Sequence, residues 1–337
     1  MKKRIIKLLI ALSLVIVYFI HQYYWNTYSF RYLITNYLVE GTNIIKITPF
    51  SRKISHTFNL KCVEKEYWIN GERVFADRYG NKLAIIDGQK VKYYKFDEFN
   101  IVDIVSNNEY IYMLFNTSPN KNKILKLDKN FNVVDESLNF EGNPRNIVLI
   151  EDDIYVVSNI LKKSNDSKSI LYRVSTKTMN LENSIYLESM SFVFRISEVD
   201  GKLLVFGNYD NIGYKLQVSK FDRNLKLELE KKYTEKALWV NNILKNDKYL
   251  IIQNEFSIIF LNKLSLDILN VYKKENCALL DVMKKKNCLY VLSLNIKSGE
   301  SYIDIVDIKT LKNIKNYKIE IGLEKENDIP SLLMDDF

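Results

Sequence analysis

The residue types that carry out most enzyme chemistry are scarce in this chain. Its 337 residues include two histidines, His21 and His56, and three cysteines, Cys62, Cys277 and Cys288. A Ser-His-Asp triad or a zinc centre with several histidine ligands therefore lacks parts. The motifs of the nucleophile elbow, the zinc-protease helix, the phosphate-binding P-loop and the EF-hand are also absent from the sequence. We expect no catalytic residue, cofactor or metal centre from the linear pattern, and we interpret the cysteines as buried thiols.

Aromatic side chains are better candidates for a binding surface. The chain contains 23 Tyr, 17 Phe and 3 Trp. Trp68 and Trp239 are the candidate ligand-binding residues, because an indole ring at the mouth of a channel can stack on a sugar or a peptide. The competing interpretation is that each of them packs in the core. Carboxylates from separate strands can also converge without any linear spacing, which leaves an acid/base pair or a calcium site open.

The composition is that of a folded protein without a surface specialised for nucleic acid. Apolar residues make up 47% and charged residues 27% of the chain, and the formal net charge is +8. Four basic residues lie within the first seven positions, and elsewhere lysine is interspersed with aspartate and glutamate. A nucleic-acid-binding protein usually carries a basic stripe on one element instead. We therefore expect no nucleic-acid partner.

The first 25 residues have the order of a secretory signal, with a basic head followed by an apolar run over residues 8–20. No small-x-small cleavage site follows, and the segment is long enough to cross about 30 Å of hydrocarbon as a helix. The anchor residues are Lys2, Lys3, Arg4 and Lys7 before the span and Tyr23, Tyr24 and Trp25 at its outer end. We predict an uncleaved signal anchor, with one transmembrane helix over residues 1–25 in the cytoplasmic membrane, the N-terminus inside and the rest of the chain outside. A cleaved signal peptide with an atypical site is the alternative.

A second helical pattern follows the predicted anchor. Apolar residues recur at helical spacing, and Gly41 stands where a C-terminal glycine would end the helix. The apolar residues are Phe30, Leu33, Ile34, Tyr37 and Leu38. We predict an amphipathic stalk helix over residues 26–42 that packs on the body of the protein or on lipid, with partner binding as the alternative.

The body of the chain repeats one unit at intervals of roughly 40 to 50 residues. Each unit contains an apolar strand, a polar turn and a second apolar strand. The turn residues are Asn108, Asp152, Asp200, Asp247 and Asn287, which are 44, 48, 47 and 40 residues apart. Five copies at such regular spacing indicate a repeat architecture.

Each unit also carries a third strand that ends in a short polar residue. These residues are Asp128, Ser175, Asp222, Asn262 and Asp307. Such side chains bond to their own backbone in turns, so each of them predicts a turn that leads to a fourth strand. Four antiparallel strands at this spacing are typical of a β-propeller blade.

Two pairs of segments carry a recognisable blade pattern: residues 289–291 with 305–310, and residues 154–156 with 171–178. They resemble the repeats of YVTN-type and quinoprotein-like β-propellers, and the resemblance extends over about residues 70–321. The WD dipeptide and the Asp-box of sialidases are absent. The resemblance implies a fold and no particular activity, since propellers include binding modules, scaffolds and enzymes.

We therefore predict an all-β fold, a β-propeller over residues 43–321 with six blades, or seven as the alternative. Strands near residues 44–47 and 57–62 would complete the ring. Residues 322–337 form an acidic C-terminal tail, interpreted either as a short docking motif or as an unstructured end.

Two classes of function fit these expectations. The first is a membrane-tethered, extracytoplasmic propeller that acts as a non-catalytic binding or scaffold module for a membrane or cell-wall protein or a cell-surface glycan. The second is an extracytoplasmic enzyme, either a glycan lyase or hydrolase or a cofactor-dependent dehydrogenase, with its site in the central channel. The lack of catalytic motifs favours the first.

Overall fold

The computed structural model describes residues 30–36, 41–48, 51–319 and 328–333, apart from 61, 64, 89, 119–120, 162–166, 211–213, 238 and 247. The predicted transmembrane segment, residues 1–25, lies outside the described residues. Every regular element within them is a β-strand, and none of their segments forms a helix long and apolar enough to cross a membrane.

Six antiparallel sheets are each built from four consecutive strands. The first comprises β4 (Glu66–Ile69), β5 (Glu72–Ala76), β6 (Lys82–Asp87) and β7 (Lys90–Lys95). The second comprises β8 (Ile101–Ser106), β9 (Ile111–Asn116), β10 (Asn122–Leu127) and β11 (Val133–Glu136), and the third β12 (Asn143–Ile150), β13 (Asp153–Ile160), β14 (Lys168–Ser175) and β15 (Leu181–Tyr186). The fourth comprises β16 (Phe192–Val199), β17 (Lys202–Asn208), β18 (Lys215–Phe221) and β19 (Leu227–Lys236). The last two are β20 (Val240–Lys245), β21 (Tyr249–Asn254), β22 (Ser257–Asn262) and β23 (Ile268–Lys273), then β24 (Cys277–Lys285), β25 (Cys288–Asn295), β26 (Ser301–Asp307) and β27 (Asn313–Ile319).

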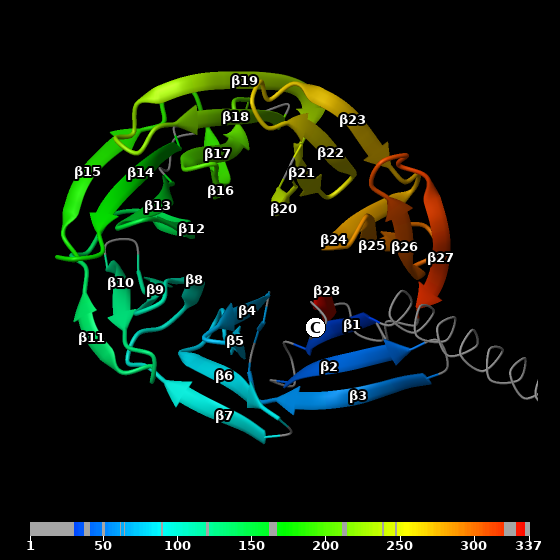
Figure 1. Ribbon diagram of the computed structural model, residues 1–337, viewed down its shortest axis with the longest axis horizontal. Coiled ribbons are helices and arrows are strands. Elements are labelled where there is room, and N and C mark those ends of the chain that lie inside the picture. Colours follow the sequence, from blue (N-terminus) through cyan, green and yellow to red (C-terminus); the bar gives the residue numbers. More distant parts are fainter. Residues whose placement is uncertain are drawn as a thin grey trace, which may run out of the picture.

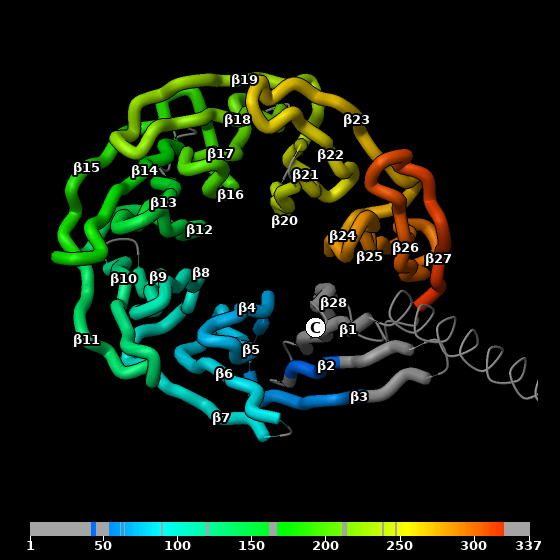
Figure 2. Tube along the Cα trace, viewed as in Figure 1, coloured from blue at the N-terminus to red at the C-terminus, as the bar shows by residue number. Residues whose placement is uncertain are grey.

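These sheets stand around a central opening as the blades of a β-propeller (Figure 1). The chain passes from one blade to the next in sequence order from β4 to β27, as Figure 2 shows. In each blade the first strand lies at the centre and the fourth at the outer edge. The predicted all-β propeller with four-stranded blades is therefore confirmed.

A seventh four-stranded sheet closes the ring with strands from both ends of the described chain. Its order is β28-β1-β2-β3, and its strands are β1 (Phe30–Asn36), β2 (Gly41–Thr48), β3 (Ser51–Phe58) and β28 (Asp328–Leu333). β28 pairs antiparallel with β1, which places Leu333 beside Arg31 and Asp328 beside Asn36. The six predicted blades correspond to the sheets of consecutive strands, and the seven-bladed alternative includes this closing sheet.

The closing sheet corrects two predicted segments. The stalk helix predicted over residues 26–42 is wrong where the structure describes it, because residues 30–36 form strand β1. Phe, Tyr, Ile and Thr in this segment favour strands, and β1 pairs with β2 on one side and with β28 on the other, which provides partners for its backbone. The tail predicted over residues 322–337 contains strand β28, so this part is neither unstructured nor a free docking motif.

The innermost strands all run in the same direction along the central channel. In the six blades of consecutive strands the first strand is innermost, and in the closing sheet β28 takes that place. Neighbouring strands pair antiparallel, for example β4 with β5 and β28 with β1. Figure 1 shows that the outermost strands, from β3 and β7 to β27, run in the same sense around the ring. The channel therefore has two distinct ends. We call the end where the innermost strands begin the strand-start rim, and the end where they finish the strand-end rim.

The hydrophobic core lies between neighbouring blades. One cluster, for example, joins Val74 of the first blade with Met113 and Phe115 of the next. Tyr155 is fully buried, and its hydroxyl donates a hydrogen bond of 2.8 Å to the backbone carbonyl of Arg223 in the adjacent blade. Burial raises the pKa of Tyr155 to about 12, so the hydroxyl stays protonated and remains a donor. Aromatic residues of this kind hold blade against blade.

The polar residues at the ends of the third strands close the following turns, as the sequence predicts. Asp222 Oδ1 accepts hydrogen bonds from the backbone N–H groups of Asn224 and Lys226, each at 2.9 Å. The same side-chain to backbone bonding occurs at Asp128, Ser175, Asn262 and Asp307. The repeat is therefore visible in the turns as well as in the strands.

Candidate functional site

A set of polar side chains follows a β-bulge in the innermost strands. In β8, β12, β16, β20 and β24 the pairing with the second strand shifts by one residue. Such an extra residue re-aims the side chain that comes after it. The residues that follow the five bulges are Asp103, Asn146, Arg195, Asn242 and Asp281, which we call the polar girdle.

Asp103 of the polar girdle bonds to the blades on both sides of its own. Its Oδ1 accepts a hydrogen bond of 3.1 Å from the Tyr67 hydroxyl and forms an ion pair with Lys65. Its Oδ2 accepts hydrogen bonds from the side-chain amide of Asn146 and, at 3.3 Å, from the backbone N–H of Ile147. Burial acts to raise the pKa of Asp103, but the charge and hydrogen bond of Lys65 outweigh it and hold that pKa below its usual value.

Other members of the polar girdle make similar bonds between blades. Asn146 Oδ1 accepts a hydrogen bond of 2.8 Å from the backbone N–H of Ile196. The side-chain amide of Asn242 donates to Asp281 Oδ1 at 2.8 Å and to the carbonyl of Val282 at 3.2 Å. The polar girdle therefore fastens successive blades together, and its two carboxylates are engaged in that task.

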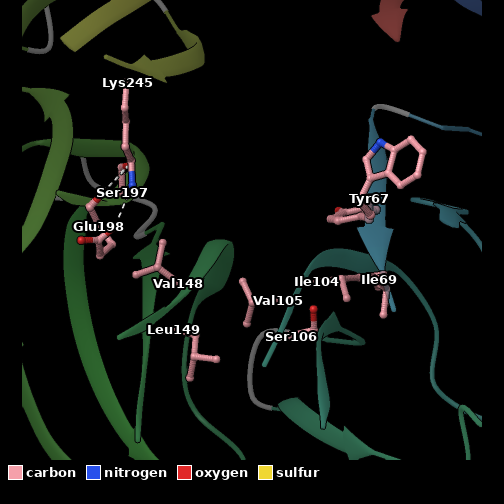
Figure 3. Close-up of a pocket in the computed structure, with 11 residues that line it drawn as sticks. Tyr67, Ile69, Ile104, Val105, Ser106, Val148, Leu149, Ser197, Glu198 and Lys245 are labelled. Carbon is pink, nitrogen blue, oxygen red and sulfur yellow. Dashed lines mark hydrogen bonds and ion pairs between the residues drawn. The ribbon is translucent and has the colours of Figure 1, made fainter. Parts of the chain in front are cut away.

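A cavity of about 360 Å³ opens at the strand-end rim. Residues at or near the ends of five successive innermost strands, β4, β8, β12, β16 and β20, line it. Tyr67 lies on one wall, and Ser197, Glu198 and Lys245 lie on the opposite wall, with Val105 between them (Figure 3). Most of the remaining lining is aliphatic. The cavity thus combines an aromatic wall, an apolar floor and one charged pair.

The charged pair of the cavity consists of Glu198 and Lys245. Lys245 Nζ lies 2.8 Å from Glu198 Oε2, and Glu198 Oε1 accepts a hydrogen bond of 2.8 Å from the backbone N–H of Gly201. Burial acts to raise the pKa of Glu198, but the hydrogen bonds from Lys245 and Gly201 outweigh it, so this pKa lies below its usual value. The side chains of Glu198 and Lys245 are 35% and 41% exposed, which leaves both accessible to a ligand.

Trp68, one of the two ligand-binding residues predicted from the sequence, lines this cavity. It belongs to β4 and is 40% exposed. Tyr67 precedes it and contributes to the same lining while its hydroxyl bonds to Asp103. Two adjacent aromatic residues therefore border the cavity from the first blade.

Trp239, the other predicted residue, lies near the strand-start rim, immediately before β20. Its ring is 5.9 Å from those of both Phe192 and Phe194, centroid to centroid. The guanidinium of Arg145 lies 5.1 Å from the Trp239 ring and 5.4 Å from the Phe192 ring. The structure thus does not bring Trp68 and Trp239 together. Trp239 belongs to an aromatic cluster in which the Arg145 guanidinium lies over the rings of Trp239 and Phe192.

The three cysteines and the possible metal ligands are the remaining candidates for chemistry. Cys62 and Cys277 are buried, as predicted, whereas Cys288 is half-buried, and burial raises the pKa of its thiol. Among the residues that the structure describes, no group of three or more His, Cys, Asp or Glu side chains is placed to hold a metal ion.

Sequence reasoning missed Glu198 and Lys245, and it missed the polar girdle. Glu198 and Lys245 are 47 residues apart and meet only because two blades stand side by side. The members of the polar girdle recur at 39 to 49 residues, each just before an apolar residue. A search of the sequence for polar residues that recur at the spacing of the blades would therefore find the polar girdle.

Comparison with known proteins defines the fold and not a family. No protein-family model matches the chain. Over 221 residues the chain is 26% identical to potassium channel K1 of Plasmodium berghei, a match that covers 63% of this chain. The chain spans about 10% of the length of that protein. Likeness at this level carries no activity over to this chain.

Several solved structures share the arrangement of strands. An ACO/RPE65 chimera superposes with a TM-score of 0.61 at 9% identity, covering 91% of this chain and 93% of the chimera. The extracellular domain of BT4673 from B. thetaiotaomicron gives a TM-score of 0.53 at 16% identity, covering 75% of this chain and 33% of that one. BamB from Moraxella catarrhalis gives 0.51 at 11% identity, covering 85% and 87%. At these identities the likeness establishes the propeller fold.

Proposed function

We propose that this chain is a non-catalytic binding propeller, tethered to a membrane, that takes a short segment of a protein or of a cell-surface glycan into the cavity at the strand-end rim. The observation that carries the proposal is the composition of that cavity. An aromatic wall with Trp68 faces the Glu198–Lys245 pair across an aliphatic floor, and five blades contribute to it.

The size and chemistry of the cavity suit a small part of a larger ligand. Its volume of about 360 Å³ lies near the lower end of the range of ligand pockets, roughly 300 to 1,000 Å³. Aromatic side chains provide a large contact area at low entropic cost, and polar groups at the margin fix orientation. A single sugar ring or one or two amino-acid side chains would fill such a space.

The bonding of the acidic groups supports binding over catalysis. Asp103 accepts hydrogen bonds from both neighbouring blades, Asp281 accepts one from Asn242, and Glu198 is paired with Lys245. A general acid or base needs a pKa near the working pH, whereas the pKa values of Asp103 and Glu198 are both lowered. These carboxylates are better suited to holding blades and orienting a ligand than to transferring protons.

The membrane tether is part of the proposal and rests on the sequence of residues 1–25. Their basic head, apolar run and terminal aromatic residues are typical of a signal anchor. The first described strand begins at Phe30, so residues 26–29 are what separates the proposed span from the propeller. The propeller would therefore work close to the membrane.

Binding by the full-length protein in lipid nanodiscs tests this function. A panel of cell-surface glycan fragments and short peptides is titrated by isothermal titration calorimetry, which does not depend on the tryptophans that are changed. We expect a saturable ligand whose affinity falls about tenfold or more in Trp68→Ala, the loss expected for a central aromatic contact. Trp239→Ala is the matched control and should bind as the parent does.

Two results would overturn the proposal. Equal weakening by Trp68→Ala and Trp239→Ala would place binding elsewhere than in the cavity. Chemical turnover of a bound panel member by the purified protein, followed by mass spectrometry, would favour the enzyme class instead.

A further inference from the structure

Both ends of the described chain reach the strand-end rim within the same sheet. β28 finishes at Leu333, and the pairing of β28 with β1 places Leu333 beside Arg31 near the start of β1. As the innermost strand of its sheet, β28 finishes at the strand-end rim like the innermost strands of the other blades. The N-terminal segment therefore joins the propeller at the rim that carries the cavity.

The strand-end rim carries a group of lysines next to this sheet. The turns of the two preceding blades contain Lys245, Lys248, Lys284, Lys285, Lys286, Lys309 and Lys312, which we call the lysine arc. Lys285 is half-buried, and the other six are exposed. Lys284 Nζ lies 3.5 Å from the carbonyl oxygen of Lys245, so the arc is continuous from one blade to the next. The acids in the same turns are Asp307 and, in the sequence, Asp247. The remaining turn of these two blades at this rim, between β22 and β23, contains Lys263 and Asp267. Lys245 is paired with Glu198 and Lys263 with Asp200.

The opposite part of the same rim carries both signs of charge. The turns in the blades β8–β11 and β12–β15 contain Glu109, Asp128, Glu151 and Asp152 together with Lys129 and Lys177. Asp152 is paired with Lys177, and Glu151 is paired with Arg223. The excess of lysine therefore lies on the side of the rim adjacent to the sheet in which the N-terminal segment enters. β24, which ends with Lys284 and Lys285 of the arc, contacts β28 directly.

We propose that the lysine arc lies against the headgroups of an anionic lipid surface. The inference rests on the membrane attachment in the proposed function. Residues 26–29 extend over at most about 14 Å, so the strand-end rim beside β1 lies within that reach of the bilayer. Lysines within about a Debye length of an anionic membrane are attracted to it, and each one adds to the attraction.

Lipid is the favoured partner of the lysine arc, because the proposed membrane span leads directly into this rim. An acidic protein would match the charge equally well, but the proposed span brings a bilayer to this rim without any further partner. The cavity opens on the same rim, so a ligand would reach it from the membrane surface. The proposal thus narrows the ligand to one that is attached to, or concentrated at, the membrane.

Lysine labelling of the full-length protein in nanodiscs tests the orientation. Discs of zwitterionic lipid are compared with discs that contain one third anionic lipid, and a membrane-impermeant acylating reagent is quantified at each lysine by mass spectrometry. We expect labelling of Lys284 and Lys286 to fall at least threefold in the anionic discs. Lys236 and Lys273, exposed at the strand-start rim, should label equally in both.

A variant with a matched control extends the test to neighbouring lysines. In Lys284→Gln, Lys285→Gln, Lys286→Gln, the protection of Lys245 and Lys248 by anionic lipid should be lost. The control changes three lysines at the strand-start rim: Lys215→Gln, Lys236→Gln, Lys273→Gln. It should keep that protection.

The outcomes separate this inference from the proposed function. Equal labelling of the lysine arc in both kinds of disc, with the protein still resistant to carbonate extraction, overturns the orientation and leaves the tether standing. Release of the protein by carbonate overturns the tether and the orientation together. Ligand binding in the cavity is measured independently through Trp68, so neither result decides it.

Discussion

Asp103 on β8 and Asn146 on β12, 43 residues apart in sequence, are joined by a hydrogen bond between their side chains. This bond links two blades at the channel, and only 2% of the surface of Asp103 is exposed. The same carboxylate bonds to Tyr67 in the blade on its other side. Three successive blades thus depend on one acidic group, which makes its charge a determinant of stability.

Asp103→Asn should destabilise the protein by about 1 to 3 kcal/mol, because the ion pair with Lys65 and the charged hydrogen bonds are lost while the shape is kept. Urea titration of the full-length protein in detergent, followed by fluorescence, measures this. Asp135→Asn, at an exposed position on β11, is the control and should leave the midpoint unchanged. An unchanged midpoint for Asp103→Asn would contradict the role of the polar girdle.

The same residue predicts a pH dependence. Because its pKa is lowered in the folded state, ionised Asp103 stabilises the fold above its unfolded pKa of about 4. That contribution is lost as the pH falls through the folded value, so the parent should lose stability from about pH 4 downward. The Asp103→Asn variant should show a shallower loss, and parallel curves for the two proteins would refute the assignment.

Glu198→Gln should change which ligand charge the cavity prefers. Removing the carboxylate frees Lys245 Nζ, now 2.8 Å from Glu198, to meet an anionic ligand. We expect affinity for a ligand that carries a carboxylate or phosphate to rise roughly two- to fivefold, the worth of an exposed ion pair. Titration against charged and neutral members of the glycan and peptide panel measures the difference.

Glu228→Gln is the control for that experiment, because Glu228 is paired with Lys202 outside the cavity lining. Glu228→Gln should change neither the affinity for charged ligands nor the affinity for neutral ones. An increase of equal size in both variants would indicate a general effect of net charge and not a local one.

Arg145→Ala should weaken the aromatic cluster near the strand-start rim. The guanidinium lies over the rings of Phe192 and Trp239, and cation–π contacts of this kind contribute about 0.5 to 2 kcal/mol. The free energy of unfolding should fall by this amount, and the emission of Trp239 should change when measured in a Trp68→Phe background. Lys236→Ala, exposed near the same rim, should change neither quantity.

Removal of residues 328–337 should prevent the ring from closing, because β28 would no longer pair with β1. We expect a large drop in the thermal midpoint, about 10 °C or more, or recovery of the protein only in aggregates. Truncation after residue 333, which keeps β28, should leave the midpoint close to that of the parent. Equal midpoints for the two truncations would show that β28 does not hold the ring.

The blade repeat could be predicted because its signals are local. Asp128, Asp222 and Asp307 each bond to the turn that follows them, so the same short residue marks the same place in successive blades. The structure of residues 30–36 could not be predicted from local signals, because an apolar stripe at helical spacing also fits a strand that is paired on both sides. Only the partner strand, nearly 300 residues later, decides between the two.

The candidate site could be predicted in part. The residue type pointed to Trp68, which lines the cavity, and equally to Trp239, which lies near the other rim. Glu198 and Lys245 belong to different blades, and nothing in either local segment indicates the other. Which residues face one another across the channel depends on blade geometry and on the bulges, and these are set by the assembled ring.

The pairing of Arg31 with Leu333 has a consequence for the time course of folding. Contacts between residues this far apart form late, because a long loop must close before they contribute. While the chain is being made, β1 has an open edge that can pair with a strand of another molecule. The newly synthesised protein is therefore most prone to aggregation just before its last strand is made, and slow synthesis would lengthen that interval.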